Sequence, residues 1–164
     1  MPIRKPVVIG LDDLARSQSF GPIAIGASLR DIGPLLHAPR YWGFGLEEKL
    51  NFYASFGGIE VHFETEFDMP RVRYAELSIS TFKGNVVRFL DKYAGGSLRL
   101  RNNLPQGGNE FESAKRFFVQ REIQFTTSFE EQVMDETAAV LNCGRLHFYY
   151  RDHECPVLDL ISLS

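Results

Sequence analysis

Apolar and polar residues alternate in the first half of the chain, over positions 50–56 and again over 59–64. A period of two is typical of a β-strand that buries one face. The Gly57-Gly58 pair between these stretches is a hairpin signal, and a third strand is expected over 71–80, after a turn. The pattern therefore predicts three consecutive antiparallel strands.

The same alternation returns near the end of the chain. We expect strands over 137–142, 145–151 and 156–164, with Cys143-Gly144 as the first turn. An extended edge strand over 125–129 is expected ahead of them. A second set of antiparallel strands is therefore predicted.

Apolar residues at helical spacing predict one helix before each set of strands. The first helix begins after Ser28, which is a good N-cap, and Asp31 lies in its first turn, where an acid suits the positive helix end. Gly33-Pro34 should kink or shorten this helix. The second helix begins at Glu110.

Other segments give less regular patterns. Residues 7–20 fit a short strand or an irregular helix, and residues 86–93 fit a helix or a strand. We expect an aromatic loop at 41–45, a short strand at 98–101 and a loop rich in Gly and Pro at 102–109.

The two ends of the chain contain similar short sequences in the same order of predicted elements. The run Val-His-Phe at 61–63 corresponds to Leu-His-Phe at 146–148, and Leu-Ser-Ile-Ser at 77–80 corresponds to Ile-Ser-Leu-Ser at 161–164. We therefore expect an internal repeat in which residues 28–80 superimpose on residues 111–164. His62 should then lie over His147.

The third strand of each set contains a slip in its alternation. Val72 and Tyr74 share one phase, whereas Ala75 and Leu77 share the other, and a similar slip follows Leu160. A β-bulge has this effect, because one extra residue moves every later side chain to the other face. We expect one bulge in each third strand.

These elements predict an α+β fold of two related helix-plus-antiparallel-strand units, with the helices packed on one face of the sheet and the polar face free. The loop at 102–109 is the expected boundary between the units, 1–104 and 105–164. Both units should belong to one compact domain, which suits a chain of 164 residues.

The segment Ile25–Pro39 has the form Gly-x-Ser, an apolar pair, Leu-Leu and then Pro, and strands follow it. It resembles the repeat unit of β-lactamase inhibitor proteins and of small outer-membrane assembly lipoproteins. The resemblance implies tandem α+β units. Those families are exported, whereas we expect neither their signal peptide nor their lipidation Cys in this chain, so the resemblance concerns the fold and not the location. In size, acidity and style the chain also resembles bacterial cytosolic immunity proteins that neutralise toxins.

The formal net charge is −3, from 18 Lys and Arg against 21 Asp and Glu. This balance disfavours a general nucleic-acid binder, which needs a basic surface, and it is compatible with a basic protein partner. The apolar run near the start is three residues long, whereas a signal peptide needs roughly 7–15. No stretch approaches the roughly 20 apolar residues of a membrane span. We expect a cytoplasmic protein.

The two cysteines, Cys143 and Cys155, fall near opposite ends of the last predicted hairpin. Several residue rises of about 3.3 Å would separate them, whereas a disulfide needs Cα atoms within about 7 Å. We expect two free thiols, as in a reducing compartment.

Catalytic chemistry has little support in the sequence. The four histidines do not show a metal-ligand spacing, although His62 lies between Glu60 and Glu64, where a metal or acid–base site is conceivable. His153 and Cys155 would share one exposed turn, which is a poor setting for a nucleophile. No glycine motif for a nucleotide or phosphate is present. We expect no catalytic residue, metal or cofactor.

Binding features are more prominent. The expected partner-binding residues are the Tyr and His of the polar strand face, the lone Trp and part of the acidic run, namely Tyr53, His62, His147, Tyr149, Trp42, Glu130, Glu131 and Asp135. Tyr and His supply large amphipathic area at low entropy cost, as interface hot spots do.

The function expected from this pattern is a protein-binding module, most concretely a bacterial immunity protein that neutralises a basic toxin domain by occlusion. One alternative is a small-ligand-binding protein or enzyme with a pocket between the sheet and the middle segment. Another is a structural subunit that self-associates through strand edges. The expected oligomeric state is a monomer or a weak homodimer.

Overall fold

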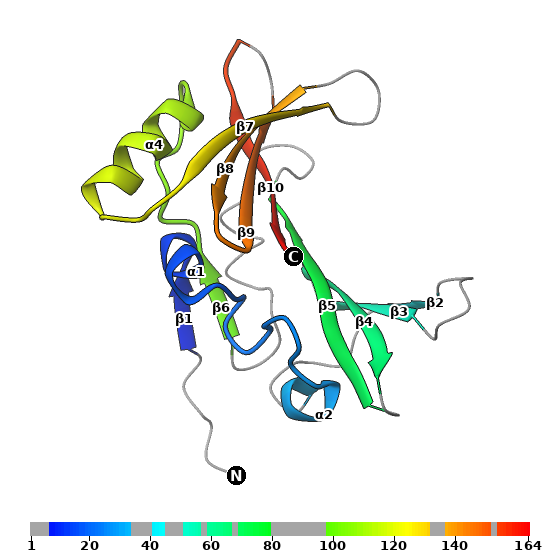
Figure 1. Ribbon diagram of the computed structural model, residues 1–164. Helices are drawn as coiled ribbons and strands as arrows, with labels where there is room; N and C mark the ends of the chain where they lie inside the picture. Colours follow the sequence, from blue (N-terminus) through cyan, green and yellow to red (C-terminus); the bar gives the residue numbers. More distant parts are fainter. Residues whose placement is uncertain are drawn as a thin grey trace.

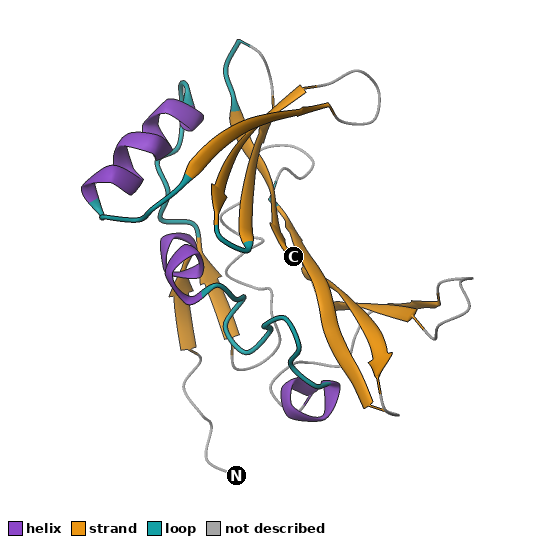
Figure 2. Cartoon of the chain, in the orientation of Figure 1, coloured by secondary structure: helices purple, strands orange, loops and turns teal. Residues whose placement is uncertain are grey.

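The computed structural model describes residues 7–33, 41–44, 51–56, 59–66, 69–79, 98–131, 137–151 and 154–164. Within them the chain is α+β, with a large antiparallel sheet and three helices (Figures 1 and 2). The helices are α1 (Leu11–Ser17), α2 (Leu29–Ile32) and α4 (Glu110–Gln120).

Eight strands form the large sheet, in the order β2-β3-β4-β5-β10-β9-β8-β7. Their bounds are β2 (Tyr41–Phe44), β3 (Asn51–Phe56), β4 (Ile59–Glu66), β5 (Met69–Ser78), β7 (Thr126–Glu131), β8 (Thr137–Cys143), β9 (Leu146–Arg151) and β10 (Val157–Leu163). Strands β1 (Val7–Gly10) and β6 (Leu98–Arg101) form a separate parallel pair.

The large sheet consists of two four-stranded meanders, β2 to β5 and β7 to β10, each with neighbouring strands adjacent in sequence. The meanders meet where β5 pairs antiparallel with β10, from Ala75 opposite Leu163 to Ser78 opposite Leu160. The backbone N–H of Ile79 extends this junction by donating to Asp159 O at 2.7 Å. The sheet is therefore continuous across both halves of the chain.

The predicted strands are confirmed, with two additions. The aromatic residues at 41–44, expected in a loop, form β2 at the edge of the sheet, so the loop assignment is wrong. Residues 7–20, for which a strand or a helix was expected, contain both β1 and α1. The segment 86–93 lies outside the described residues.

One face of the sheet supplies the core, and we call it the inner face. Ile59, Val61 and Phe63 of β4 are buried there, as are alternate residues of β9. Helix α4 packs on β8 and β10, and α2 on β5. The ring of Phe118 lies edge-on to Phe148, with 5.5 Å between centroids. Full burial of each such side chain stabilises the fold by about 1.5–3 kcal/mol.

Side-chain caps fix the starts of two helices. Ser28 Oγ accepts the backbone N–H of Asp31 at 3.2 Å, so the predicted N-cap is confirmed. Asn109 Oδ1 accepts the backbone N–H of Glu112 at 3.0 Å, at the start of α4. Each cap satisfies a donor that the first helical turn leaves unpaired.

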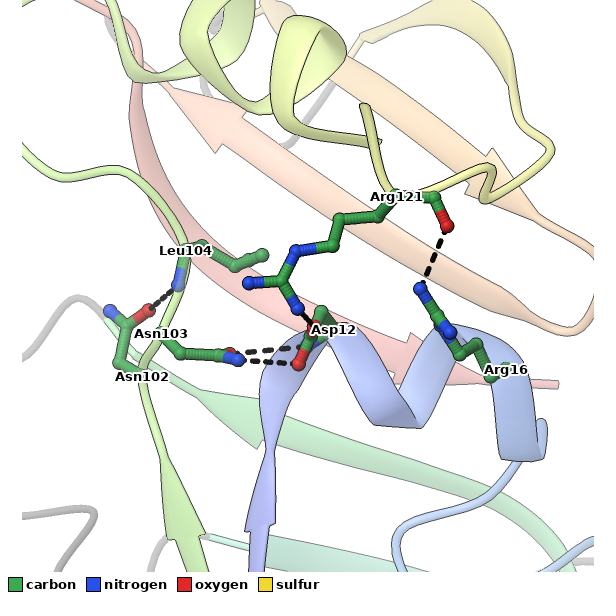
Figure 3. A network of polar contacts seen from close by, with 6 residues as sticks. All are labelled: Asp12, Arg16, Asn102, Asn103, Leu104 and Arg121. Carbon is green, nitrogen blue, oxygen red and sulfur yellow. Dashed lines mark hydrogen bonds and ion pairs between the residues drawn. The ribbon is translucent and has the colours of Figure 1, made fainter. Parts of the chain in front are cut away.

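A buried carboxylate ties three distant segments together (Figure 3). Asp12, in the first turn of α1, accepts from Arg121 Nη1 at 3.0 Å, just after α4, and from Asn103 Nδ2, just after β6. Arg16 Nη2 donates to the backbone oxygen of Arg121 at 2.7 Å. The Asp12 side chain thus contacts residues that lie 91 and 109 positions away in the sequence.

The end of α1 is fixed to the turn between β8 and β9. Gln18 Nε2 donates to Cys143 O at 2.8 Å, and the backbone N–H of Arg145 donates to Gln18 Oε1 at 2.6 Å. The side-chain amide thus pairs with the turn as a peptide group would. A Cβ at Gly144 would overlap Gln18 Oε1, and Gly144 has φ of +61°, so this position requires glycine.

Both predicted β-bulges are confirmed. In β5, Val72 lies opposite Phe63 and Tyr74 opposite His62, which leaves Arg73 as the extra residue. In β10 the register shifts between Leu158 and Leu160, which leaves Asp159 as the extra residue.

The strand register contradicts one detail of the expected repeat. Leu77 lies opposite Ile59, whereas Ile161, its expected counterpart, lies opposite Phe148. Superimposing these two pairs places His62 over Arg151. His62 and His147 therefore cannot coincide when the third strands are aligned as the sequence suggests, because the hairpins differ in register.

Candidate functional site

The side chains that alternate with the core positions point to the opposite surface, which we call the outer face. Its central strands carry a group of polar and aromatic side chains. We call this group the outer-face cluster: Tyr53, Glu60, His62, Tyr74, Glu76, Glu130, Tyr149 and Ser162.

An aromatic row crosses the first meander. His62 of β4 lies opposite Tyr53 of β3 and Tyr74 of β5. Its ring stacks on Tyr53 with 5.5 Å between centroids and meets Tyr74 edge-on at 5.4 Å. The His62 side chain is 40% exposed. These three rings form a half-exposed aromatic surface of the kind that anchors protein interfaces.

Two carboxylates form the next row. Glu60 and Glu76 lie directly opposite each other on β4 and β5, and like charges in this arrangement repel. Each has a hydrogen-bonding neighbour on its own strand: His62 Nε2 lies 2.8 Å from Glu60 Oε1, and Tyr74 Oη donates to Glu76 Oε2 at 2.9 Å. The row therefore concentrates negative charge at the middle of the outer face.

Tyr149 continues the cluster across the β5–β10 junction. Its hydroxyl is within hydrogen-bonding reach of Ser162 and Glu130. Burial raises the pKa of Tyr149, and burial together with Glu76 raises the pKa of Tyr74. Both hydroxyls are therefore protonated at neutral pH and can donate to a carboxylate.

His147 occupies a different environment from His62. It lies between Asn142 of β8 and Ser162 of β10, and its Nδ1 is 2.7 Å from Asn142 Oδ1. Asn142 Nδ2 in turn donates to Ser128 Oγ at 3.0 Å. This polar chain lies on the outer face of the second meander.

The arginines at the border of the cluster are paired with acids. Arg151 Nε is 2.7 Å from Asp159 Oδ2, and Arg73 Nε is 4.0 Å from Glu64 Oε2. The cluster itself contains three carboxylates and neither Lys nor Arg, so its charge is negative.

The outer face is not open across its whole width. Ala138, Val140 and Ser162 point to this side yet are buried. The expectation of a free polar face is therefore wrong along β8. The half-exposed part of the cluster lies mainly over β3, β4 and β5.

The structure brings together four of the eight expected binding residues, Tyr53, His62, Tyr149 and Glu130, and places His147 on the same face. Trp42 is on β2, opposite Ala54 in the ladder, and Glu131 ends β7. Asp135 lies outside the described residues.

Sequence reasoning missed Tyr74, Glu76 and Ser162. The slip in alternation predicts a bulge in this strand, but the bulged residue is Arg73, one position earlier than the pattern suggests. Tyr74 therefore lies on the outer face with His62, and not on the inner face with Val72. Ser162 faces Glu76 only because β10 pairs with β5, and such long-range pairing leaves no local signal.

A shallow groove of about 780 Å³ lies where α4 leads into β7. Its lining is partly apolar, with Val119, Ile123 and Phe125 beside Gln124, Thr126, Asn142 and Gly144. None of these side chains titrates near neutral pH. In the described part of the chain, no three His, Cys, Asp or Glu side chains are grouped as a metal site would require.

Both cysteines are free thiols, with Cys143 buried and Cys155 exposed. The expectation of two unpaired cysteines is confirmed. Burial raises the pKa of Cys143 to about 12, so this thiol is neutral and unreactive at physiological pH.

Comparisons of the chain with protein-family models, curated proteins and solved structures give no match. None of the helices in the described ranges has the length and apolar character needed to span a membrane.

Proposed function

We propose that this chain is a protein-binding module whose outer-face cluster receives a basic surface of another protein. In its most concrete form it is a bacterial immunity protein that acts in the cytoplasm and neutralises a toxin domain by occlusion. The observation that carries the proposal is the Glu76 carboxylate, which lies opposite Glu60 and accepts from Tyr74 in the middle of a half-exposed aromatic surface.

A partner Lys or Arg suits this surface for two reasons. A cation between Glu60 and Glu76 would relieve their mutual repulsion and gain charge-assisted hydrogen bonds. The faces of Tyr53 and Tyr74 could also hold the same cation by cation–π attraction, worth about 0.5–2 kcal/mol. Occlusion requires a broad complementary surface and no reacting group, which agrees with the composition of the cluster.

A photo-crosslinking experiment tests the proposal without knowledge of the partner. A photoreactive amino acid replaces His62 on the outer face or, as control, the exposed Arg116 on α4. We expect a discrete protein adduct in cells from position 62 and a much weaker one from position 116. No adduct from position 62, or equal adducts from both, would contradict the proposed surface.

A survival assay then separates an immunity protein from other binding modules. The captured protein is expressed alone and together with this chain. An immunity function predicts that the captured protein is toxic and that the wild-type chain restores growth, whereas Glu76→Lys does not. A harmless captured protein would retain the binding proposal and remove the immunity proposal.

The groove beside α4 supports a second candidate, a small-ligand-binding protein. Its lining offers apolar contacts from Val119, Ile123 and Phe125 with a few polar groups, a composition typical of ligand sites. A thermal-shift screen with apolar metabolites tests this function, and a stabilising compound should lose its effect in Val119→Asp.

We also infer that the two meanders are copies of one helix-plus-strand unit with their helices on a single face. Leu77 and Ile161, equated by the sequence match, lie opposite each other at the β5–β10 junction, as an approximate two-fold axis there requires. Buried residues of α1, α2 and α4 belong to the inner-face core. The resemblance to β-lactamase inhibitor proteins, which have tandem units of this kind, is part of the same proposal.

A further inference from the structure

The outermost strand of the second meander, β7, has an unusually regular edge. It pairs with β8 through six consecutive residues without a register shift, and no described residue pairs with its other side. Natural edge strands are commonly protected by Pro, Lys, a bulge or a covering segment. The sequence of β7, Thr-Thr-Ser-Phe-Glu-Glu, contains neither Pro nor Lys, and its charged residues are confined to Glu130 and Glu131 at its end.

Phe129 lies on this edge and is 73% exposed, the most exposed of the large hydrophobic residues in the described part of the chain. It is opposite Ala139, so it points to the inner face, where its ring is 6.5 Å from that of Phe111. An exposed Phe beside unpaired backbone groups is a typical pairing surface.

The symmetry of a self-paired edge restricts its register. A two-fold axis perpendicular to the sheet keeps every side chain on its own face, and residues opposite each other in a ladder share a face. The axis must therefore pass through a residue position. An axis at Glu130 would bring two carboxylates together, and an axis at Ser128 would leave the two Phe129 rings facing Thr127.

An axis at Phe129 avoids both problems. Phe129 then faces the partner's Phe129, and Ser128 faces the partner's Glu130. Ser128 Oγ already accepts from Asn142 Nδ2 at 3.0 Å, so its hydroxyl proton can be donated to the partner's Glu130 carboxylate. Each copy would supply this hydrogen bond once, on the outer face.

We propose that a second copy of this chain pairs antiparallel with β7 about Phe129, extending the sheet from eight to sixteen strands. The contact involves few residues, so the dimer forms reversibly as concentration rises. It would place two outer-face clusters on the same side of one sheet. This inference shares Glu130 with the proposed binding surface, but β7 pairing leaves the rest of that surface, over β3, β4 and β5, uncovered.

Sedimentation equilibrium tests the association. Between about 1 µM and about 1 mM, the average mass of the wild-type chain should rise from 18.7 kDa toward twice that value. Phe129→Glu should stay monomeric over the same range with an unchanged melting temperature, since the side chain is exposed. A wild-type chain that is monomeric throughout, or a dimer that persists in Phe129→Glu, would overturn the proposal.

Disulfide trapping tests the register separately, in a Cys155→Ser background. Phe129→Cys places the two thiols opposite each other at about 4.5–5.5 Å between Cα atoms, within disulfide range. Thr127→Cys places them about four residues apart along the strands, or roughly 14 Å. Rapid intermolecular disulfide formation is expected at 129 only, and equal or faster formation at 127 would contradict this register.

Discussion

The buried carboxylate of Asp12 gives the sharpest stability prediction. Its side chain is 3% exposed and accepts from Arg121 Nη1 through Oδ2 and from Asn103 Nδ2 through Oδ1. Asp12→Asn keeps the shape of the side chain and leaves one acceptor oxygen for two donors. One donor must then face the new amide NH₂ group, whichever way the amide is turned.

The expected loss follows from these contacts. A hydrogen bond to a charged group contributes about 1.5–3 kcal/mol. Breaking a fully buried ion pair costs about 3–5 kcal/mol, but Arg121 is 50% exposed and can recover hydration in the variant. We therefore expect Asp12→Asn to lower the free energy of unfolding by about 2 kcal/mol. For a chain of this size, that corresponds to a melting-temperature decrease of about 4–8 °C.

Urea denaturation followed by circular dichroism measures this loss, with an unchanged m-value as the sign of unaltered folded and unfolded states. Asp13→Asn is the matched control, because Asp13 is the next residue of the same helical turn and is exposed. It should change stability by less than about 0.5 kcal/mol. Equal effects of the two substitutions would refute the role assigned to Asp12.

The remaining predictions concern Tyr150, the two cysteines and Gly144. Tyr150 is buried and its hydroxyl has no hydrogen-bond partner among the described residues, so Tyr150→Phe should raise the free energy of unfolding by up to about 1 kcal/mol in urea. Burial raises the pKa of the Tyr150 hydroxyl above its ordinary value of 10.0. As the pH rises past about 10, the unfolded chain therefore loses this proton before the folded chain does, and the free energy of unfolding falls. Tyr150→Phe should make that fall smaller. A thiol reagent at pH 8 should modify Cys155 quickly and Cys143 only after unfolding, and rapid modification of two thiols in the native protein would show that Cys143 is accessible. Gly144→Ala should cost about 2 kcal/mol or more in the same urea assay, because alanine is strained at this φ and its Cβ overlaps Gln18; a loss below about 0.5 kcal/mol would show that the turn adapts.

Local sequence patterns predicted most of the secondary structure. The alternation at 50–64 located β3 and β4, and the Ser28 and Asp31 pair located the start of α2. The aromatic segment at 41–44, expected in a loop, is a strand because it pairs with β3. Composition alone does not reveal such tertiary pairing.

The candidate site was predicted only in part. The polar phase of β4 and β9 correctly placed His62 and Tyr149 on one face, because alternation fixes the face once the strand is known. Glu76 could not be assigned to the centre of that face, since its position depends on the location of a bulge and on the β5–β10 pairing. The sequence pattern also does not predict that Asp12 is buried, because an acid in the first turn of a helix usually lies in solvent.

The binding affinity of the protein captured through position 62 tests the central claim most directly. Isothermal titration calorimetry compares the wild-type chain with Glu76→Lys and with Glu122→Lys, an equal charge change at an exposed residue after α4. We predict that Glu76→Lys binds about 100-fold more weakly, which corresponds to about 2.7 kcal/mol, and that Glu122→Lys stays within about threefold of wild type. Equal affinities for Glu76→Lys and wild type, with both chains folded, would contradict the assignment of the outer face as the binding surface.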